Sequence, residues 1–309
     1  MTRGGRIFGV IVVSGILAYA ISVLYPQFDA LFLALIFGVF ASSFFDEQSK
    51  EVAEKVLSIT LPIGIAMYGA NIRLSSEVPY HFVIIATFSA LLLGSFVYIF
   101  SRKVFNINKR LALLLSCGTA ICGASAIAIL ASLVKPKKEE FSTAIIVITI
   151  VGLTGALILP YLYHVFSLSL KQYALLCGAT LHQTGLVEIA TKPFGAEVVR
   201  DALEIKGVRI ALIAIVAFFA SISYSEHRYY VPWYIAAFLI ISYFSSFIIP
   251  PSIVNVLRPI STIAFSITLA SVGFSANLRD IQRMRFDPLV AAYAGWMCAF
   301  LIIFSLVVV

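Results

Sequence analysis

Small and polar residues interrupt an apolar segment of the chain at Leu115-Ser-Cys-Gly-Thr-Ala-Ile-Cys-Gly-Ala-Ser-Ala-Ile127. A second apolar segment carries Leu176-Cys-Gly-Ala-Thr-Leu-His-Gln-Thr-Gly-Leu-Val187, which shares the Cys-Gly pair and the same alternation of small and polar types. The two segments, 111–134 and 172–191, are apolar on either side of these stretches. A helix that faces lipid should have none of these residues at its centre, so we predict that both segments are broken or re-entrant helices.

The rest of the chain indicates a membrane protein. Its 309 residues are 61% hydrophobic and 12% charged, with a mean hydropathy of +1.01, which cannot give a water-compatible surface. We predict an all-α polytopic protein with a single transmembrane domain over 1–309, about nine transmembrane helices and the two broken segments. A bilayer core of about 30 Å needs about 20 helical residues, and suitable segments lie at 7–24, 29–45, 51–72, 79–101, 142–165, 208–224, 231–249, 256–276 and 287–309.

The formal charge of +7 comes from basic residues in short loops between apolar segments. This distribution is typical of membrane proteins, whose cytoplasmic loops are enriched in lysine and arginine. The sequence has no stripe of basic residues interleaved with aromatic ones, so it does not indicate a nucleic-acid-binding protein. We expect a cytoplasmic N-terminus and cytoplasmic loops at 102–110 and 279–285. Arg3 and Arg6 precede a first helix without a small-residue cleavage site, so that helix is expected to be retained.

Three lysines after the first broken segment constrain the topology: Lys135, Lys137 and Lys138. A full crossing by 111–134 would put them outside, directly after a cytoplasmic basic loop. A hairpin that enters and leaves on the cytoplasmic side avoids this conflict, and a hairpin from the outer side at 172–191 keeps the later helices in phase. Broken helices that cross fully remain the alternative.

Internal similarity supports an inverted repeat. Besides the two broken segments, Ala70-Asn-Ile-Arg73 resembles Ala276-Asn-Leu-Arg279, and each ends an apolar helix. We predict repeat-related halves at about 1–134 and 172–309, linked by a central helix at 142–165. Many secondary transporters are built in this way and hold their solute near the middle of the bilayer.

A half-helix that starts after a break directs its amide groups at the bilayer centre, which favours an anion. In the first segment the candidate solute-binding groups are Thr119, Ser125 and the amides of Gly123 and Ala124. In the second they are Thr180, His182, Gln183, Thr184 and Gly185. Close helix packing is the alternative role for the small residues, whereas His and Gln inside a membrane segment favour a site.

His182 can bind the solute, relay a proton or bond to broken backbone. Glu188 is the one acid well inside an apolar stretch, and it either carries a coupling proton or sodium ion or pairs with Lys192 four residues on. Lys206 and Arg209 share a helix face and either guide an anion inward or anchor at the interface.

No motif of an enzyme occurs, so we do not expect catalysis. Cys117, Cys122, Cys177 and Cys298 lie in apolar segments without the spacing of a zinc site, so neither a metal nor another cofactor is expected.

Several motifs occur in the order found in a known family. The run Cys122-Gly-Ala-Ser-Ala-Ile127, a lysine-rich loop, the run Gly178-Ala-Thr-Leu-His182 and then Lys206 and Arg209 resemble the sulfate exporter (YeiH-like) family of prokaryotic inner-membrane proteins over nearly the whole chain. The resemblance implies export of sulfate or a related small anion. It also implies that the turn from Cys122 to Ser125 and His182 line the site, with Lys206 and Arg209 as supporting cations.

The chain departs from this family beside the histidine. Gln183 stands where many members have an acid, Leu186 replaces a later glutamine, and Glu188 replaces an apolar residue. These changes bear on the identity of the substrate and of the coupling ion. The residues and the resemblance together lead us to expect a secondary transporter for sulfate or another small anion in the inner membrane. A homodimer is a further expectation. The alternative is a sodium- or proton-coupled organic-acid carrier or a cation antiporter.

Overall fold

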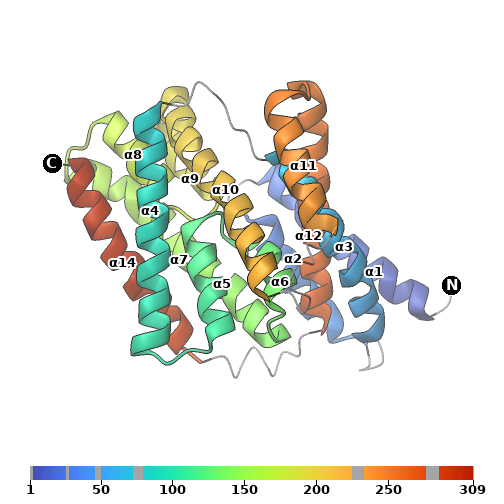
Figure 1. Cartoon of the computed structure of the whole chain (residues 1–309). Helices are drawn as coiled ribbons and strands as arrows, with labels where there is room; N and C mark the ends of the chain where they lie inside the picture. Colours follow the sequence, from blue (N-terminus) through green and yellow to red (C-terminus); the bar gives the residue numbers. More distant parts are fainter. Residues whose placement is uncertain are drawn as a thin grey trace. The chain divides into compact units, whose positions relative to one another are not determined.

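The computed structural model describes residues 3–25, 28–45, 50–71, 79–224, 233–275 and 285–308. Every regular element within these ranges is helical (Figure 1), which confirms the predicted all-α class. The chain divides into two compact units, each assembled from three segments. Unit 1 comprises Met1–Arg73, Ala131–Thr143 and Val216–Met284, and unit 2 comprises Leu74–Leu130, Ala144–Ile215 and Arg285–Val309.

Unit 1 is built around one long helix, α12 (Pro251–Ser275), which packs against three others. These are α1 (Arg3–Leu24), α2 (Ala30–Ser42) and α3 (Lys50–Tyr68). The helix α11 (Trp233–Phe247) covers α3 and the 3-10 turn Gly69–Asn71 that follows it. The polar contacts between these helices include the 2.8 Å hydrogen bond between the hydroxyls of Thr60 and Thr268.

Unit 2 contains both interrupted segments. The helix α4 (Tyr80–Ile99) is extended by the π-helical turn Phe100–Val104 and contacts α5 (Lys109–Ala120) and α14 (Asp287–Val308) (Figure 1). The helix α8 (Leu170–Thr180) contacts α14, α4 and α9 (Thr184–Thr191). Three helices have residues in both units: α6 (Ala124–Val134), α7 (Lys138–Val165) and α10 (Ala196–Tyr224).

Both predicted interruptions are confirmed. The segment 111–134 consists of α5 and α6, with Ile121 to Gly123 between them, and 172–191 consists of α8 and α9, with Leu181 to Gln183 between them. Side chains cap the N-terminal ends of α5 and α8. Asn108 accepts a hydrogen bond from the Arg110 amide at the start of α5, and Ser169 and Gln172 form a capping box at the start of α8.

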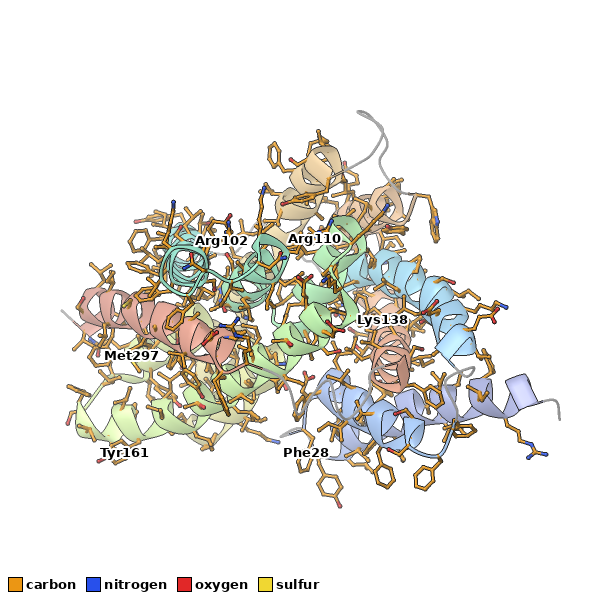
Figure 2. All side chains as sticks on the ribbon, turned by 90° about the horizontal axis from the view of Figure 1, so that it is seen from below. Phe28, Arg102, Arg110, Lys138, Tyr161 and Met297 are labelled. Atoms are coloured by element: carbon orange, nitrogen blue, oxygen red, sulfur yellow. The ribbon has the colours of Figure 1, made fainter. Side chains whose placement is uncertain are left out.

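Seven helices in the described residues are long and apolar enough to cross a membrane, and they include α1, α3, α4, α7, α10, α12 and α14. The predicted spans at 29–45 and 231–249 correspond to the shorter helices α2 and α11. Large apolar side chains point away from the ribbon, as Phe28, Tyr161 and Met297 show (Figure 2). Such outward-facing apolar surface suits contact with lipid.

Two expectations about internal symmetry extend beyond the described residues. Ile72 and Arg73 of the first Ala-Asn motif lie outside them, as do all four residues from Ala276 to Arg279 of the second. The repeat-related halves at 1–134 and 172–309 are consecutive in sequence, whereas the two compact units interleave. The inverted repeat therefore stays a prediction.

Candidate functional site

The two helix breaks of unit 2 meet at Gly123 and Gln183, the residues that immediately precede α6 and α9. Gly123 has a φ of +68°, a left-handed conformation that favours glycine. A Cβ added to Gly123 would stand 2.6 Å from Cγ of Gln183. The turn between α5 and α6 therefore needs glycine for its backbone angle and for the space that Gln183 fills, and α6 and α9 begin side by side.

The carbonyl ends of α5 and α8 converge on the guanidinium of Arg209. Its Nε donates to the carbonyl oxygen of Ala120 at 2.9 Å, and its Nη2 donates to that of Thr119 at 2.8 Å. Its Nη1 faces three carbonyl oxygens at the end of α8, those of Gly178, Ala179 and Leu181, at 3.0, 2.8 and 2.9 Å. One side chain thus bonds the last carbonyls of both half-helices.

Lys206 bridges the two breaks one turn before Arg209 on α10. Its Nζ donates to the carbonyl oxygen of Ile121 in the first break at 2.7 Å. In the second break it donates to those of Leu181 and His182, at 2.8 and 2.5 Å. An ammonium group has three N–H donors, so backbone carbonyls take up its full donor capacity. Each broken helix end thereby has partners for carbonyls that lipid could not satisfy.

The close approach of α10 to α8 depends on Gly178. A Cβ at this position would stand 2.5 Å from the carbonyl oxygen of Ala202 and 2.9 Å from Cβ of Ile205. Any larger residue would push the helices apart. Lys206 and Arg209 follow directly on α10. This close contact therefore sets the distance between the backbone of α10 and the carbonyl oxygens that the two side chains bond.

The charge around the breaks is positive. Lys206 and Arg209 are both 0% exposed, and no acidic side chain in the described ranges forms an ion pair with either. Their negative partners are the C-terminal ends of α5 and α8, each equivalent to roughly −0.5 elementary charge. Two helix ends therefore offset about half of the two positive charges. Full burial also distinguishes this pair from interface anchors, whose charged heads lie in water.

The starts of α6 and α9 add partial positive charge on the other side of the breaks. The first hydrogen bonds within these helices run from the Ile127 amide to the Gly123 carbonyl and from the Val187 amide to the Gln183 carbonyl, at 3.1 and 3.2 Å. The amides of 124–126 and 184–186 precede these bonds and have no acceptor inside their own helices. Two neighbouring helix N-termini suit a negatively charged group.

His182 and Gln183 hold polar atoms without partners in the described residues. His182 is 0% exposed and Gln183 5% exposed, yet Nδ1 and Nε2 of His182 and Oε1 of Gln183 have no hydrogen bond. The Nε2 of Gln183 donates to the hydroxyl of Thr149 at 3.4 Å. An unsatisfied buried polar group costs about 1–3 kcal/mol, so each of these atoms calls for a partner such as a bound solute, an ion or a water molecule.

The other candidate residues divide into buried and exposed sets. The Thr119 and Thr180 hydroxyls are buried and donate to carbonyls of their own helices, those of Leu115 and Leu176, at 2.8 and 2.7 Å. Cys122 and Ala124 are buried and Ser125 is half-buried, whereas Thr184 and Glu188 lie on the exposed side of α9. The structure thus brings His182, Gln183, Gly123, Lys206 and Arg209 together and directs Glu188 elsewhere.

Three neighbours of His182 and Gln183 escaped the sequence analysis: Thr149, Gly152 and Trp296. A Cβ at Gly152 would stand 3.5 Å from Nδ1 of His182. The indole of Trp296 lies 6.4 Å from the imidazole, centroid to centroid, and donates to the Thr180 carbonyl at 3.3 Å. Gly152 and Thr149 interrupt the apolar helix α7 and could have signalled a contact, whereas Trp296 in α14 carries no such signal.

Comparison with known proteins gives a family for this chain. Residues 6–292 match the family model described as "Conserved hypothetical protein 698". A "UPF0324 membrane protein" of Archaeoglobus fulgidus is 46% identical over 285 residues, which cover 91% of this chain and 86% of that protein. This chain belongs to that family of membrane proteins.

More distant relatives carry the same description. UPF0324 membrane proteins of Listeria monocytogenes and Staphylococcus aureus are 29% and 27% identical, over 86% and 77% of this chain and 83% and 75% of their own length. No solved structure matches the chain. The family and the apolar helices agree in describing a multi-pass membrane protein.

Proposed function

We propose that this protein is a secondary transporter for sulfate or a related small anion, an exporter in the prokaryotic inner membrane with its N-terminus in the cytoplasm. The observation that carries the proposal is the bonding of Lys206 and Arg209. Two buried cations bond the carbonyl ends of two broken helices, and no acid in the described ranges neutralises them.

The electrostatic consequence supports an anion as solute. Burying two positive charges is costly unless nearby negative charge offsets them. Two helix C-termini supply about one unit of negative charge, which leaves room for a bound anion. The N-termini of α6 and α9 begin next to these cations, and their amide groups are suited to hold anionic oxygens without a protein carboxylate.

The interruption of both helices supports movement of a solute rather than a purely structural role. Each break frees backbone groups that cost several kcal/mol in hydrocarbon. A receptor or assembly subunit gains nothing from two such breaks placed together, whereas a carrier uses them to build a site deep in the bilayer. The unpaired atoms of His182 and Gln183 are further polar groups that a solute can bond.

Coupling to a proton or sodium ion is part of the proposal, with Glu188 and His182 as the candidate carriers of that ion. Glu188 is exposed on α9, four residues after Thr184 on the same helix face. An acid on an apolar helix is expected to contact water rather than lipid. The alternative function, an organic-acid carrier coupled to either ion or a cation antiporter, makes Glu188 the main ion-binding residue.

Flux through the purified protein tests the proposal. The full chain is reconstituted in liposomes loaded with radioactive sulfate or thiosulfate, and efflux is followed under a proton gradient or a sodium gradient. We expect efflux above that of protein-free liposomes. Absence of flux for any small anion under either gradient would contradict the function, and sodium flux without anion flux would favour a cation antiporter.

A further inference from the structure

The side-chain atoms without partners beside the helix N-termini indicate which hydrogen-bonding groups the solute carries, in addition to its negative charge. Sulfate at neutral pH is fully deprotonated and offers only hydrogen-bond acceptors. The amide groups that begin α6 and α9 are donors, so they suit sulfate and every other oxyanion equally. Selection among anions therefore depends on the side chains at this place, and the two described here with unpaired atoms are those of His182 and Gln183.

The imidazole of His182 requires two kinds of partner. A neutral imidazole carries one N–H donor and one acceptor nitrogen, and both nitrogens are buried without partners in the described part of the chain. We assign the neutral form because the ring is fully buried and because Lys206, which bonds the carbonyl of His182 itself, and Arg209 already place two positive charges here. A ligand that offers acceptors alone satisfies one nitrogen and leaves the other unpaired.

The carboxamide of Gln183 adds a second acceptor. Its Nε2 is directed at the Thr149 hydroxyl, which leaves Oε1 as a buried acceptor without a donor. The opposite orientation of the amide would leave a donor instead, but the demand from His182 is the same in both cases. Because its Cγ lies against Gly123, this side chain reaches the start of α6 as well as that of α9.

We propose that the solute at the two breaks is a small anion that carries a hydrogen-bond donor of its own, and that His182 selects it through that donor. The donor is the hydroxyl of a hydroxycarboxylate or the remaining proton of a partly protonated oxyanion. This inference rests on the proposed carrier function and names its substrate class. It places fully deprotonated sulfate below such anions in preference.

Two pairs of anions that differ in the donor test the proposal in proteoliposomes of the full chain. Lactate and propionate differ by one hydroxyl, and phosphate and sulfate are both tetrahedral, but only phosphate keeps a proton at neutral pH. Each is measured at the same pH and gradient as radioactive efflux above that of protein-free liposomes. We expect at least about five-fold higher flux for the donor-bearing member of a pair, because an unmade buried hydrogen bond lowers affinity by about that factor or more.

The outcomes separate the two sources of the donor and the two levels of the proposal. Preference in the lactate pair alone identifies a hydroxycarboxylate, and preference in the phosphate pair alone identifies a partly protonated oxyanion. Flux of sulfate and propionate at or above that of their partners overturns the donor requirement and leaves the carrier function intact. No flux for any of the four anions overturns both.

Variants of His182 assign the preference to this residue. His182→Phe removes both ring nitrogens, so the ratio within the preferred pair should fall to within two-fold of unity. His182→Asn keeps a donor group and an acceptor group and should retain part of the preference. His164→Phe, at the exposed end of α7, is the matched control and should leave the ratio unchanged. A full preference in both His182 variants would remove His182 from the selection, and His182→Asn keeps this test open if His182→Phe does not fold.

Discussion

The side chain of Gln183 lies over Gly123, so the residue before α9 fills the space that any larger residue before α6 would need. Substitution Gly123→Ala should therefore cost about 1–3 kcal/mol in backbone strain and also displace Gln183. We expect a lower midpoint of thermal unfolding in detergent and a loss of anion flux. Gly9→Ala on α1, where an added Cβ meets nothing within 4 Å, should leave both unchanged. Normal flux in Gly123→Ala would show that the contact is dispensable.

Lys206→Met should remove the hydrogen bonds by which one side chain joins the two helix breaks. The Leu181 carbonyl would keep its bond from Arg209, but those of Ile121 and His182 would lose the donor recorded here. Each such buried carbonyl costs about 1–3 kcal/mol, so thermal stability and flux should both fall. Lys171→Met, an exposed site on α8, controls for the loss of a lysine. If Lys206→Met unfolded at the same temperature as the Lys171 control, the bridging role of Lys206 would be rejected.

Arg209→Lys should lower both stability and anion flux although it preserves the positive charge. Arg209 bonds five carbonyl oxygens of two helix ends with a planar fork, and lysine offers three donors from one point. We expect reduced thermal stability and at least ten-fold lower flux, whereas Arg200→Lys on the exposed side of α10 should be silent. Equal flux in both variants would mean that charge alone is required.

Glu188→Gln tests the coupling ion. If Glu188 carries the proton or sodium ion, this variant should still exchange anions across the membrane but should no longer accumulate them in response to an ion gradient. Glu197→Gln, at another exposed acid, should keep full coupling. Gradient-driven transport that survives in Glu188→Gln would exclude Glu188 and leave His182 as the candidate.

Cysteine labelling tests the predicted re-entrant topology. Lys103 and Lys137 flank the segment of α5 and α6 and are both exposed. Single cysteines at these positions, with the four native cysteines replaced, should react with a membrane-impermeant reagent from the same, cytoplasmic side. Labelling of Lys137→Cys from outside would instead indicate that the broken helix crosses the membrane fully.

Much of the fold follows from residue type. The breaks at Gly118 to Ser125 and Thr180 to Thr184 were predictable because small and polar residues are unsuited to lipid at the centre of an apolar segment. The start of α10 was predicted at 208 instead of Ala196. Glu197, Arg200, Asp201 and Glu204 made this part look like a loop, although charged residues readily form a helix where one end meets water.

The candidate site was only partly predictable. Spacing by three places Lys206 and Arg209 on one helix face, but their partners are backbone carbonyls, which every residue possesses and no sequence pattern marks. Trp296 shows the same limit, since a tryptophan in an apolar helix suits lipid, core or site equally well. Gly152 was overlooked because a single glycine in a long helix more often serves packing than a neighbouring histidine.

One turn of α10 supplies the cations for both helix breaks. Leu181 makes the connection closest, because its carbonyl oxygen accepts from Lys206 at 2.8 Å and from Arg209 at 2.9 Å. A small rotation or slide of α10 would withdraw donors from the end of α5 and the end of α8 together. The two broken helices therefore share their donors, and a movement of α10 would alter the hydrogen bonds at both helix ends at once.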